Sequence, residues 1–361
     1  MDWFLKKTDW YLTGAVALLL LLSSSILYSL SVNNPDNLSW FYRQLVWIGV
    51  GIVCFIVFSL IDYRVFNQGA ILAFLYTGGF LTLLAVLIFG TTISGNRAWF
   101  SFFGFTFQPV EPIKLLLVML LAYYFSEKNI EIWRTRHILI SAGFLLGFLG
   151  LILMQPDLGS GLVLMGIWFL MILLSGARVK QVLALIFLAL ALFGIGWQWL
   201  FTENQKDRIL VLTSPNRDPL GVAYSQNQAL IAIGSGGLLG KGLGKGSQAQ
   251  LGFLPAARTD FIFAVLAEEL GLVGVLIMIF AFGIIFWRLT QLALLDLSNF
   301  IRLFSLGYLS IIFLHTFINL GMNLGFLPVI GIGLPFLSYG GSNLIALFIG
   351  LGIINSIRLR I

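Results

Sequence analysis

The stretch that decides the fold is residues 251–270, LGFLPAARTDFIFAVLAEEL. It begins beside a long, polar, glycine-rich segment and ends in an apolar run that continues for the length of a membrane-spanning helix. Asp260 lies at the junction between these two parts. A carboxylate at the edge of an apolar helix loses part of its hydration, which costs free energy. We therefore interpret the rest of the chain as the scaffold that places this residue.

The composition is that of an integral membrane protein. Of the 361 residues, 59% are hydrophobic and 10% are charged, whereas a soluble domain carries roughly 25% charged residues. Several windows contain about 20 predominantly apolar residues, enough for a helix to cross a bilayer. We expect an all-α polytopic membrane protein, a single domain over residues 1–361. Its bundle of ten transmembrane helices is expected near residues 12–30, 45–61, 70–89, 109–125, 138–154, 159–175, 181–200, 261–287, 301–322 and 342–357.

Several other classes of protein and site are excluded. The first apolar segment is too long for the core of a signal peptide and lacks a clear cleavage site, so we expect it to be retained. Cys54 is the only cysteine and lies within an apolar span, which excludes a disulfide framework and a cysteine-based metal cluster. The net charge of +6 is explained by membrane topology, and we expect no nucleic-acid partner.

The loops between the spans alternate in basic content, which predicts their orientation. Arg43 and Arg97 are the basic residues of the short loops in one set, with Lys114 just inside a span. Because basic loops stay in the cytoplasm, both termini are expected there, and the loop of residues 201–260 between the seventh and eighth spans is expected outside. The other set holds twelve basic residues: Lys6, Lys7, Arg64, Lys128, Arg134, Arg136, Arg178, Lys180, Arg288, Arg302, Arg358 and Arg360.

Asp260 has two interpretations. Thr259 or Asp260 could cap the eighth span by accepting a hydrogen bond from a free backbone N–H group. Alternatively, Asp260 is a general base, since partial burial raises the pKa of a carboxyl and makes the carboxylate a better proton acceptor. Taken alone, the cap is favoured, because caps are far more common than catalytic groups.

Four further charged residues at the outer ends of the spans allow a similar choice. Glu111 and Lys114 share one face of the fourth span, either as a structural ion pair or as a site that holds an anionic headgroup. Arg97 is either an interfacial arginine beside Trp99 or a phosphate contact. Asp157 follows Pro156 and is favoured as a helix cap, unless it also points into a shared cavity.

The glycine-rich run of residues 234–246, GSGGLLGKGLGKG, resembles a nucleotide-binding loop only superficially. The register of a P-loop requires Ser or Thr after the lysine, but Gly242 follows Lys241 and Gly246 follows Lys245. The run is therefore either a backbone that orders around an anionic ligand, with Lys241 and Lys245 as contacts, or a mobile loop.

The last two spans carry buried polar groups. His315, Asn319 and Asn323 form one stripe on the ninth span, which favours interhelical hydrogen bonds. Glu268 and Glu269 lie about two turns into the eighth span, so at least one needs a basic or hydrogen-bonding partner. Residues 334–342, with Ser338 and Gly340-Gly341, interrupt the chain and predict a cavity, because irregular backbone at membrane depth must be covered.

These observations converge on the outer edge of one bundle. Glu111, Lys114, Arg97, Asp157 and Asp260 all map there, and such mixed charge suits a lipid with an anionic headgroup. The pattern alone leaves open whether the protein moves that lipid or reacts with it.

The same residues resemble the SEDS family (shape, elongation, division and sporulation), the RodA- and FtsW-like polymerases of bacterial peptidoglycan. The resemblance covers essentially the whole chain. A RodA-like member is preferred over an FtsW-like one, from the Pro219-Leu220-Gly221 and Ser247-Gln248 segments. The motifs that carry the resemblance are Asn96-Arg97-Ala98-Trp99, Gln108-Pro109-Val110-Glu111 with Lys114, Gln155-Pro156-Asp157-Leu158-Gly159, Thr259-Asp260-Phe261-Ile262-Phe263-Ala264, Glu268-Glu269-Leu270-Gly271, and Asn319-Leu320-Gly321-Met322 with residues 334–342.

The resemblance implies an inverting lipid II glycosyltransferase in the bacterial cytoplasmic membrane, with its active site outside. Asp260 would be the catalytic base. Lys114, Arg97, Arg258, Lys241, Lys245 and Ser338 would contact the substrate. Glu111 and Asp157 would orient these groups or hold a divalent cation, Mg²⁺ or Mn²⁺. The expected partners are lipid II, membrane lipids and a class B penicillin-binding protein.

Three departures from the family pattern leave Asp260 in place. Ala256-Ala257-Arg258 stands where many members carry Glu and His or Asn, and Val110 and Asn343 replace usual serines. Arg258 adds a cation beside the proposed base. The alternatives are a lipid II flippase and a non-catalytic scaffold of a cell-wall synthase, and a flippase requires polar groups that reach both faces.

Overall fold

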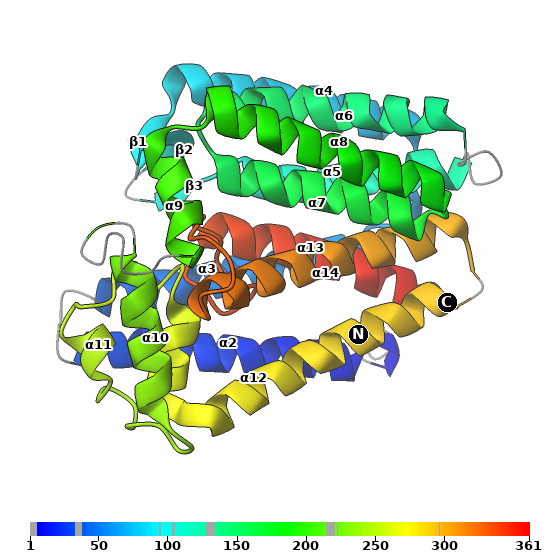
Figure 1. Cartoon of the computed structure of the whole chain (residues 1–361). Coiled ribbons are helices and arrows are strands. Elements are labelled where there is room, and N and C mark those ends of the chain that lie inside the picture. The colour runs from blue at the N-terminus through cyan, green and yellow to red at the C-terminus, as the bar shows by residue number, and fades with distance from the viewer. Residues whose placement is uncertain are drawn as a thin grey trace.

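The computed structural model describes residues 6–32, 38–93, 95–102, 105–127, 134–213, 221, 223–295 and 297–361. Long helices run side by side along one direction, and shorter elements gather at one end of the bundle (Figure 1). Lys128 and the Pro219-Leu220 pair lie outside the described residues.

The ten predicted spans correspond to ten helices within the described residues, and the chain is an all-α polytopic membrane protein. Eight of these helices are long and apolar enough to cross a membrane. The other two are α7, which is shorter, and α5, which contains Glu111 and Lys114. The ten are α2 (Trp10–Val32), α3 (Leu38–Leu60), α4 (Gly69–Phe89), α5 (Val110–Glu127), α6 (Thr135–Met154), α7 (Leu158–Leu174), α8 (Val179–Ile195), α12 (Ile262–Leu294), α13 (Asn299–Asn323) and α14 (Gly341–Leu359).

Most of the shorter elements lie at the end of the bundle opposite the two termini (Figure 1). We call this the loop end. It holds β1 (Thr91–Ile93), β2 (Asn96–Phe102) and β3 (Phe105–Phe107), and the helices α9 (Glu203–Thr213), α10 (Tyr224–Gly236) and α11 (Ser247–Gln250). A 3₁₀ turn, η2 (Tyr63–Asn67), follows α3, and a π turn, η4 (Gly196–Leu200), follows α8. The glycine-rich run and the segment around Asp260, which were singled out from the sequence, therefore share the loop end with the strands.

Two features of the loop end were not expected from the sequence. The strands form an antiparallel meander in the order β1-β2-β3, within a segment that we expected to be a loop. The long connection between α8 and α12 contains three helices, α9–α11. Each of these elements is short, and α11 has only four residues.

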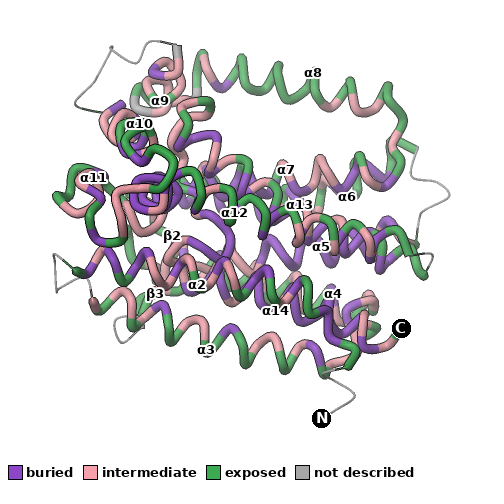
Figure 2. Tube along the Cα trace, turned by 90° about the horizontal axis from the view of Figure 1, so that it is seen from below, coloured by how far each residue is buried: buried purple, intermediate pink, exposed green. Residues whose placement is uncertain are grey.

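The centre of the bundle is formed by α5, α13 and α14, whose side chains are mostly buried. In contrast, α8 has no buried residue and lies at the edge of the molecule (Figure 2). Apolar side chains such as Phe187 and Leu190 on α8 are exposed, as expected for a helix that faces lipid.

The glycine-rich run fills a break in α12 at Gly271, where the backbone has φ +65°. The break exposes backbone groups that the run then pairs. The N–H groups of Lys241 and Gly242 donate to the carbonyls of Glu268 and Glu269, at 3.0 and 2.9 Å. In return, the N–H groups of Leu272 and Val273 donate to the carbonyls of Gly237 and Leu238. The first part of α12, residues 262–270, is thereby held at the loop end.

The close approach between run and helix requires glycine. A Cβ on Gly240 would lie 2.1 Å from the Glu269 carbonyl oxygen, and one on Gly236 would lie 1.9 Å from that of Ala267. Gly240 and Gly242 also have φ of +76° and +95°, which other residues rarely adopt. The glycines are therefore required by packing, and the run is an ordered part of the fold.

Candidate functional site

Asp260 lies in a tight turn just before α12. Ala256 has φ +49°, a left-handed conformation that is strained for a non-glycine residue, and its carbonyl accepts hydrogen bonds from the N–H groups of Thr259, Asp260 and Phe261. The helix begins at Ile262 with Phe261 as the N-cap, and no side chain provides the cap hydrogen bond. The interpretation of Asp260 or Thr259 as the helix cap is therefore wrong, because the turn moves both residues ahead of the cap position.

The Asp260 carboxyl is half-buried, and its pKa is raised above the ordinary range of an aspartate. Burial raises its pKa from 3.8 to about 6, since the charged form loses hydration. A hydrogen bond with the Thr259 side chain and the charge of Arg208 on α9 act in the opposite direction. A carboxylate with this pKa is ionised at neutral pH and is still basic enough to accept a proton.

The backbone around Asp260 is held by residues that follow it by about sixty to eighty positions in the chain. Ser338 Oγ donates to the Thr259 carbonyl at 2.5 Å, and the Tyr339 N–H group donates to the Arg258 carbonyl at 2.9 Å. The Asp260 carbonyl accepts hydrogen bonds from the side-chain amides of Asn319 and Asn323 on α13. Ser338, predicted as a substrate contact, thus lies beside the Asp260 turn and holds its backbone.

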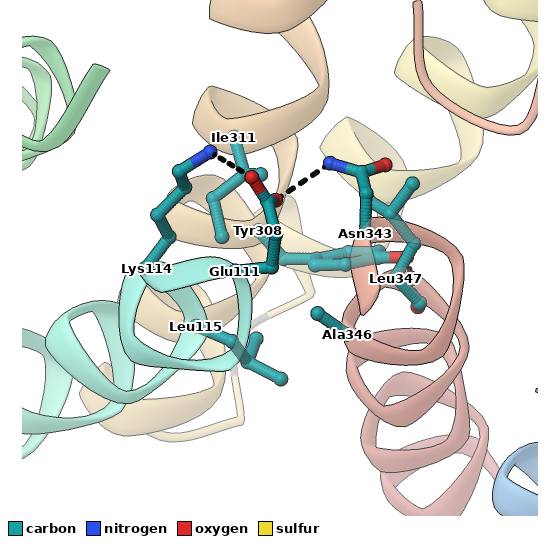
Figure 3. Close-up of a pocket in the computed structure, with 8 residues that line it drawn as sticks. All are labelled: Glu111, Lys114, Leu115, Tyr308, Ile311, Asn343, Ala346 and Leu347. Atoms are coloured by element: carbon teal, nitrogen blue, oxygen red, sulfur yellow. Dashed lines mark hydrogen bonds and ion pairs between the residues drawn. The ribbon is translucent and has the colours of Figure 1, made fainter. Parts of the chain in front are cut away.

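Glu111 and Lys114 form a buried ion pair that connects three helices. Lys114 Nζ lies 2.7 Å from Glu111 Oε1 and 3.2 Å from His315 Nε2 on α13. Asn343 Nδ2 on α14 donates to Glu111 Oε2 at 2.7 Å, so Glu111 lies between Lys114 and Asn343 (Figure 3). The adjoining cavity of about 10 Å³ has room for about one water molecule. The structure thus shows the structural ion pair, one of the two alternatives for these residues.

Asp157 caps α7 and is also buried. Its Oδ1 accepts from the Ser160 N–H group at 3.0 Å, and its Oδ2 accepts from Ser160 Oγ and from Gln108 Nε2 at 2.8 and 3.0 Å. The Gln108 N–H group in turn donates to Ser342 Oγ at the start of α14. Asp157 therefore joins the ends of α5, α7 and α14 at the loop end.

Arg97 on β2 is exposed and turned toward α4. Its Nε donates to the Gly90 carbonyl at 2.9 Å and its Nη2 to the Ile88 carbonyl at 2.7 Å. A cation at a helix C-terminus is stabilised by the helix dipole. The structure thus places Arg97 at the end of α4, and these contacts do not reach Asp260.

Arg258 lies at the edge of a second cavity at the loop end. Its guanidinium carbon is 3.9 Å from the centre of the Trp40 ring, and Trp40 packs edge-on against Tyr339 at 5.0 Å. The cavity has a volume of about 200 Å³ and is otherwise apolar, with Leu27, Leu30 and Leu254 in its walls.

The two lysines of the glycine-rich run have different environments. Lys241 Nζ lies 2.7 Å from the fully buried Glu268 Oε1 and 2.9 Å from Ser247 Oγ. Lys245 is exposed. Glu269 accepts hydrogen bonds from Ser29 Oγ and from Gln250 Nε2. The expectation that at least one of the two glutamates has a basic or hydrogen-bonding partner is confirmed for both.

The structure brings Asp260, Arg258 and Ser338 together, and it places the Glu111–Lys114 pair against His315, one turn along α13 from Asn319. Arg97, Lys241 and Lys245 belong to other parts of the loop end. Sequence reasoning did not identify Arg208, whose charge acts on Asp260 and whose Nη1 donates to the Val329 carbonyl at 3.1 Å. The sequence shows Arg208 only as one basic residue of the long loop, and this does not indicate that it lies near Asp260.

The carboxylates proposed for a divalent cation do not fit that role. Both oxygens of Glu111 and both of Asp157 already accept hydrogen bonds from protein groups. Within the described residues, no three His, Cys, Asp or Glu side chains gather in a way that could hold a metal ion. Glu111 and Asp157 are therefore not assigned as metal ligands, and a need for Mg²⁺ or Mn²⁺ stays a prediction that chelation would test.

Comparison with known proteins places the chain in one family. The model of the FtsW, RodA and SpoVE family, described as "Cell cycle protein", matches residues 5–360. The chain is 37% identical to the peptidoglycan glycosyltransferase MrdB of Escherichia coli K12, over 98% of this chain and 96% of the relative. It is 34% identical to stage V sporulation protein E of Bacillus subtilis, over 97% of each.

Solved structures agree. The rod shape determining protein RodA of Thermus thermophilus has a TM-score of 0.72 and 32% identity, over 97% of this chain and 96% of that one. A chain from a structure of a peptidoglycan synthase complex that coordinates polymerisation and crosslinking has a TM-score of 0.83 and 33% identity, over 97% of each. The chain belongs to the FtsW, RodA and SpoVE family of cell cycle proteins, the SEDS family that its motifs resemble.

Proposed function

We propose that this chain is a peptidoglycan glycosyltransferase that polymerises lipid II into β-1,4 glycan strands at the outer face of the bacterial cytoplasmic membrane. The observation that carries the proposal is Asp260. It is a half-buried carboxyl with a pKa of about 6, in a turn whose backbone is fixed, in a chain similar to MrdB over nearly its full length. Both termini would lie in the cytoplasm, which puts the loop end outside.

In this reaction the Asp260 carboxylate accepts the proton of the 4-hydroxyl group of the acceptor GlcNAc. The resulting oxygen nucleophile attacks the anomeric carbon of the donor MurNAc and forms the new glycosidic bond. The bond from that carbon to the pyrophosphate breaks, and undecaprenyl pyrophosphate leaves with the electron pair. Attack from the opposite side inverts the anomeric centre and gives the β linkage.

The leaving pyrophosphate needs cations that are already in place. Arg208 and Arg258 support this role, because each is close to the Asp260 turn and each has a guanidinium that matches phosphate oxygens. Lys114, which is buried against Glu111 and lies 3.2 Å from His315 on α13, would contribute to the electrostatics of the site. Arg97, Lys241 and Lys245 remain candidates for contacts with the sugars or phosphates at the rim.

We also propose that the chain works with a class B penicillin-binding protein, a single-span transpeptidase. The similar solved chain comes from a synthase complex that coordinates polymerisation with crosslinking. Polymerisation and crosslinking act on the same glycan strand, so a partner that holds both sites near one membrane surface would shorten the path of the product.

The proposal is tested with purified wild-type protein and the Asp260→Asn variant, each given lipid II with its transpeptidase partner present. The amide preserves the shape of the side chain and cannot accept the proton. We expect the wild type to make glycan polymer and the variant to lose about 100- to 10,000-fold of the rate, the usual contribution of a general base.

Two results would contradict the proposal. Polymerisation by Asp260→Asn at the wild-type rate would remove Asp260 as the base. A wild-type protein that makes no polymer but moves lipid II across liposomes would instead support the flippase alternative.

A further inference from the structure

We infer that Asn319 and Asn323 on α13 are positioning residues that aim the Asp260 carboxylate by holding its backbone. This inference rests on the proposed role of Asp260. The sequence favoured only interhelical hydrogen bonds for the stripe of His315, Asn319 and Asn323, and the structure gives two of these residues a specific target.

Two side-chain amides converge on one carbonyl. Asn319 Nδ2 lies 2.9 Å and Asn323 Nδ2 lies 3.0 Å from the carbonyl oxygen of Asp260, and both asparagines are fully buried. Asn323 Nδ2 also faces the carbonyl oxygen of Asn319 at 2.9 Å. Because oxygens surround this position, the nitrogen of the amide must face them, and the alternative orientation would place oxygen against oxygen.

Asn319 also fixes the segment opposite the carboxylate. The same Nδ2 donates to the Ile332 carbonyl at 2.7 Å. The preceding residue, Gly331, has φ +75°, and a Cβ added there would lie 3.7 Å from Asp260 Oδ2. One amide thus binds both the backbone that carries the carboxylate and the backbone that faces it, which sets the gap between them.

We call the hydrogen bonds that residues 319–339 donate to the Asp260 turn the clamp. The clamp is needed because the turn itself is strained. Ala256 has φ +49° at the start of the turn, and such strain persists only where the surroundings over-determine it. With Ser338 on Thr259 and Tyr339 on Arg258, three successive carbonyls accept hydrogen bonds from residues 319–339. The two buried amides hold the last of these three, nearest to the carboxylate.

The test compares Asn323→Leu and Asn319→Leu with Asn355→Leu in full-length protein with its transpeptidase partner. Leucine keeps the branched shape and the number of heavy atoms of the side chain and removes the donors. Asn355 is the matched control, because it is also buried on a helix and donates to Ser59 Oγ at 3.2 Å, on α3 rather than at the Asp260 turn. The readouts are kcat and KM for lipid II and the pH dependence of kcat/KM.

We expect each α13 variant to lower kcat about 100-fold, the effect of misplacing a reacting group by about 1 Å, with KM little changed. We also expect the acid limb of the pH profile to move to lower pH. A released carboxylate regains water and its pKa falls, while the charge of Arg208 and the Thr259 hydroxyl still act on it. Asn355→Leu should change neither quantity.

Unchanged kcat in both α13 variants would overturn the inference. So would an equal loss in Asn355→Leu, or a lower kcat with an unmoved acid limb. If both α13 variants fail to fold, Ser338→Ala removes the next hydrogen bond of the clamp, and the same results decide. A fully active Asp260→Asn variant would contradict the proposed function itself, so the two failures are distinguishable.

Discussion

Asp260 and Glu268 lie eight residues apart, and their surroundings give the two carboxyl groups different roles. Glu268 is fully buried and accepts hydrogen bonds from Lys241 Nζ, Ser247 Oγ and the Gln248 N–H group. Its oxygens are saturated by protein donors, so it is structural. Asp260 is half-buried, has a raised pKa and stays available to a substrate hydroxyl.

This contrast predicts that Glu268 matters for stability. Glu268→Ala leaves Lys241 and the start of α11 without their acceptor, and we expect a loss of about 3 kcal/mol, as for a broken buried ion pair. The exposed pair Glu203–Lys206 on α9 is the matched control. Glu203→Ala should change thermal stability in detergent little, because exposed pairs contribute little. Equal melting temperatures for the two variants would contradict the structural role of Glu268.

At the scale of elements, the break in α12 separates the long membrane-spanning part of the helix from the short part that follows the Asp260 turn. Gly271 has φ +65°, and a Cβ there would lie 2.3 Å from the Gly240 backbone nitrogen. Residues 262–270 therefore belong to the loop end, and only the rest of α12 lies along the bundle.

We predict that Gly271→Ala is strongly destabilising. With φ +65° and ψ −161°, Gly271 lies in a region that is almost restricted to glycine and costs other residues about 1–3 kcal/mol, and the clash with Gly240 adds to this. Gly283→Ala, in the continuous part of α12, meets open space and should be neutral or stabilising, since alanine favours a helix over glycine. Thermal melting of both variants checks this, and a tolerated Gly271→Ala would show that the break is not required.

The sequence predicted the transmembrane helices well, because a single requirement, the apolar environment of the bilayer, determines them. Hydrocarbon requires long apolar helices, so ten spans could be placed with boundaries near those observed. The role of the glycine-rich run could not be predicted, because the sequence shows glycines but not the break at Gly271 that they fill. The partners of the Asp260 turn could not be predicted either, since Asn319, Asn323 and Ser338 lie about sixty to eighty residues further along the chain. Local patterns therefore favoured the cap, which the structure excludes.

At the scale of the whole molecule, the fold gathers its longest irregular segments at one end. The β meander, α9–α11, the Asp260 turn and residues 324–340 lie opposite the two termini (Figure 1). Irregular backbone is tolerated only where protein or water covers it. This arrangement suits the proposed chemistry at one face of the membrane.

This arrangement predicts the labelling of single cysteines in intact cells. In a Cys54→Ala background, Leu251→Cys should react with a membrane-impermeant maleimide, because residue 251 is exposed at the loop end. Leu297→Cys, exposed between α12 and α13, should react only after the cells are permeabilised. The reverse pattern would contradict the orientation inferred from the basic loops.

The central claim is that Asp260 is the base of the reaction, and the pH dependence of lipid II polymerisation tests it most directly. The base acts only when ionised, and its pKa is raised from 3.8 to about 6. We therefore predict that kcat/KM rises with pH, about tenfold per unit below pH 6 and levelling above it. The Asp260→Asn variant should lack this limb in whatever activity it retains. A wild-type profile that is flat between about pH 4.5 and 7.5 would contradict the account.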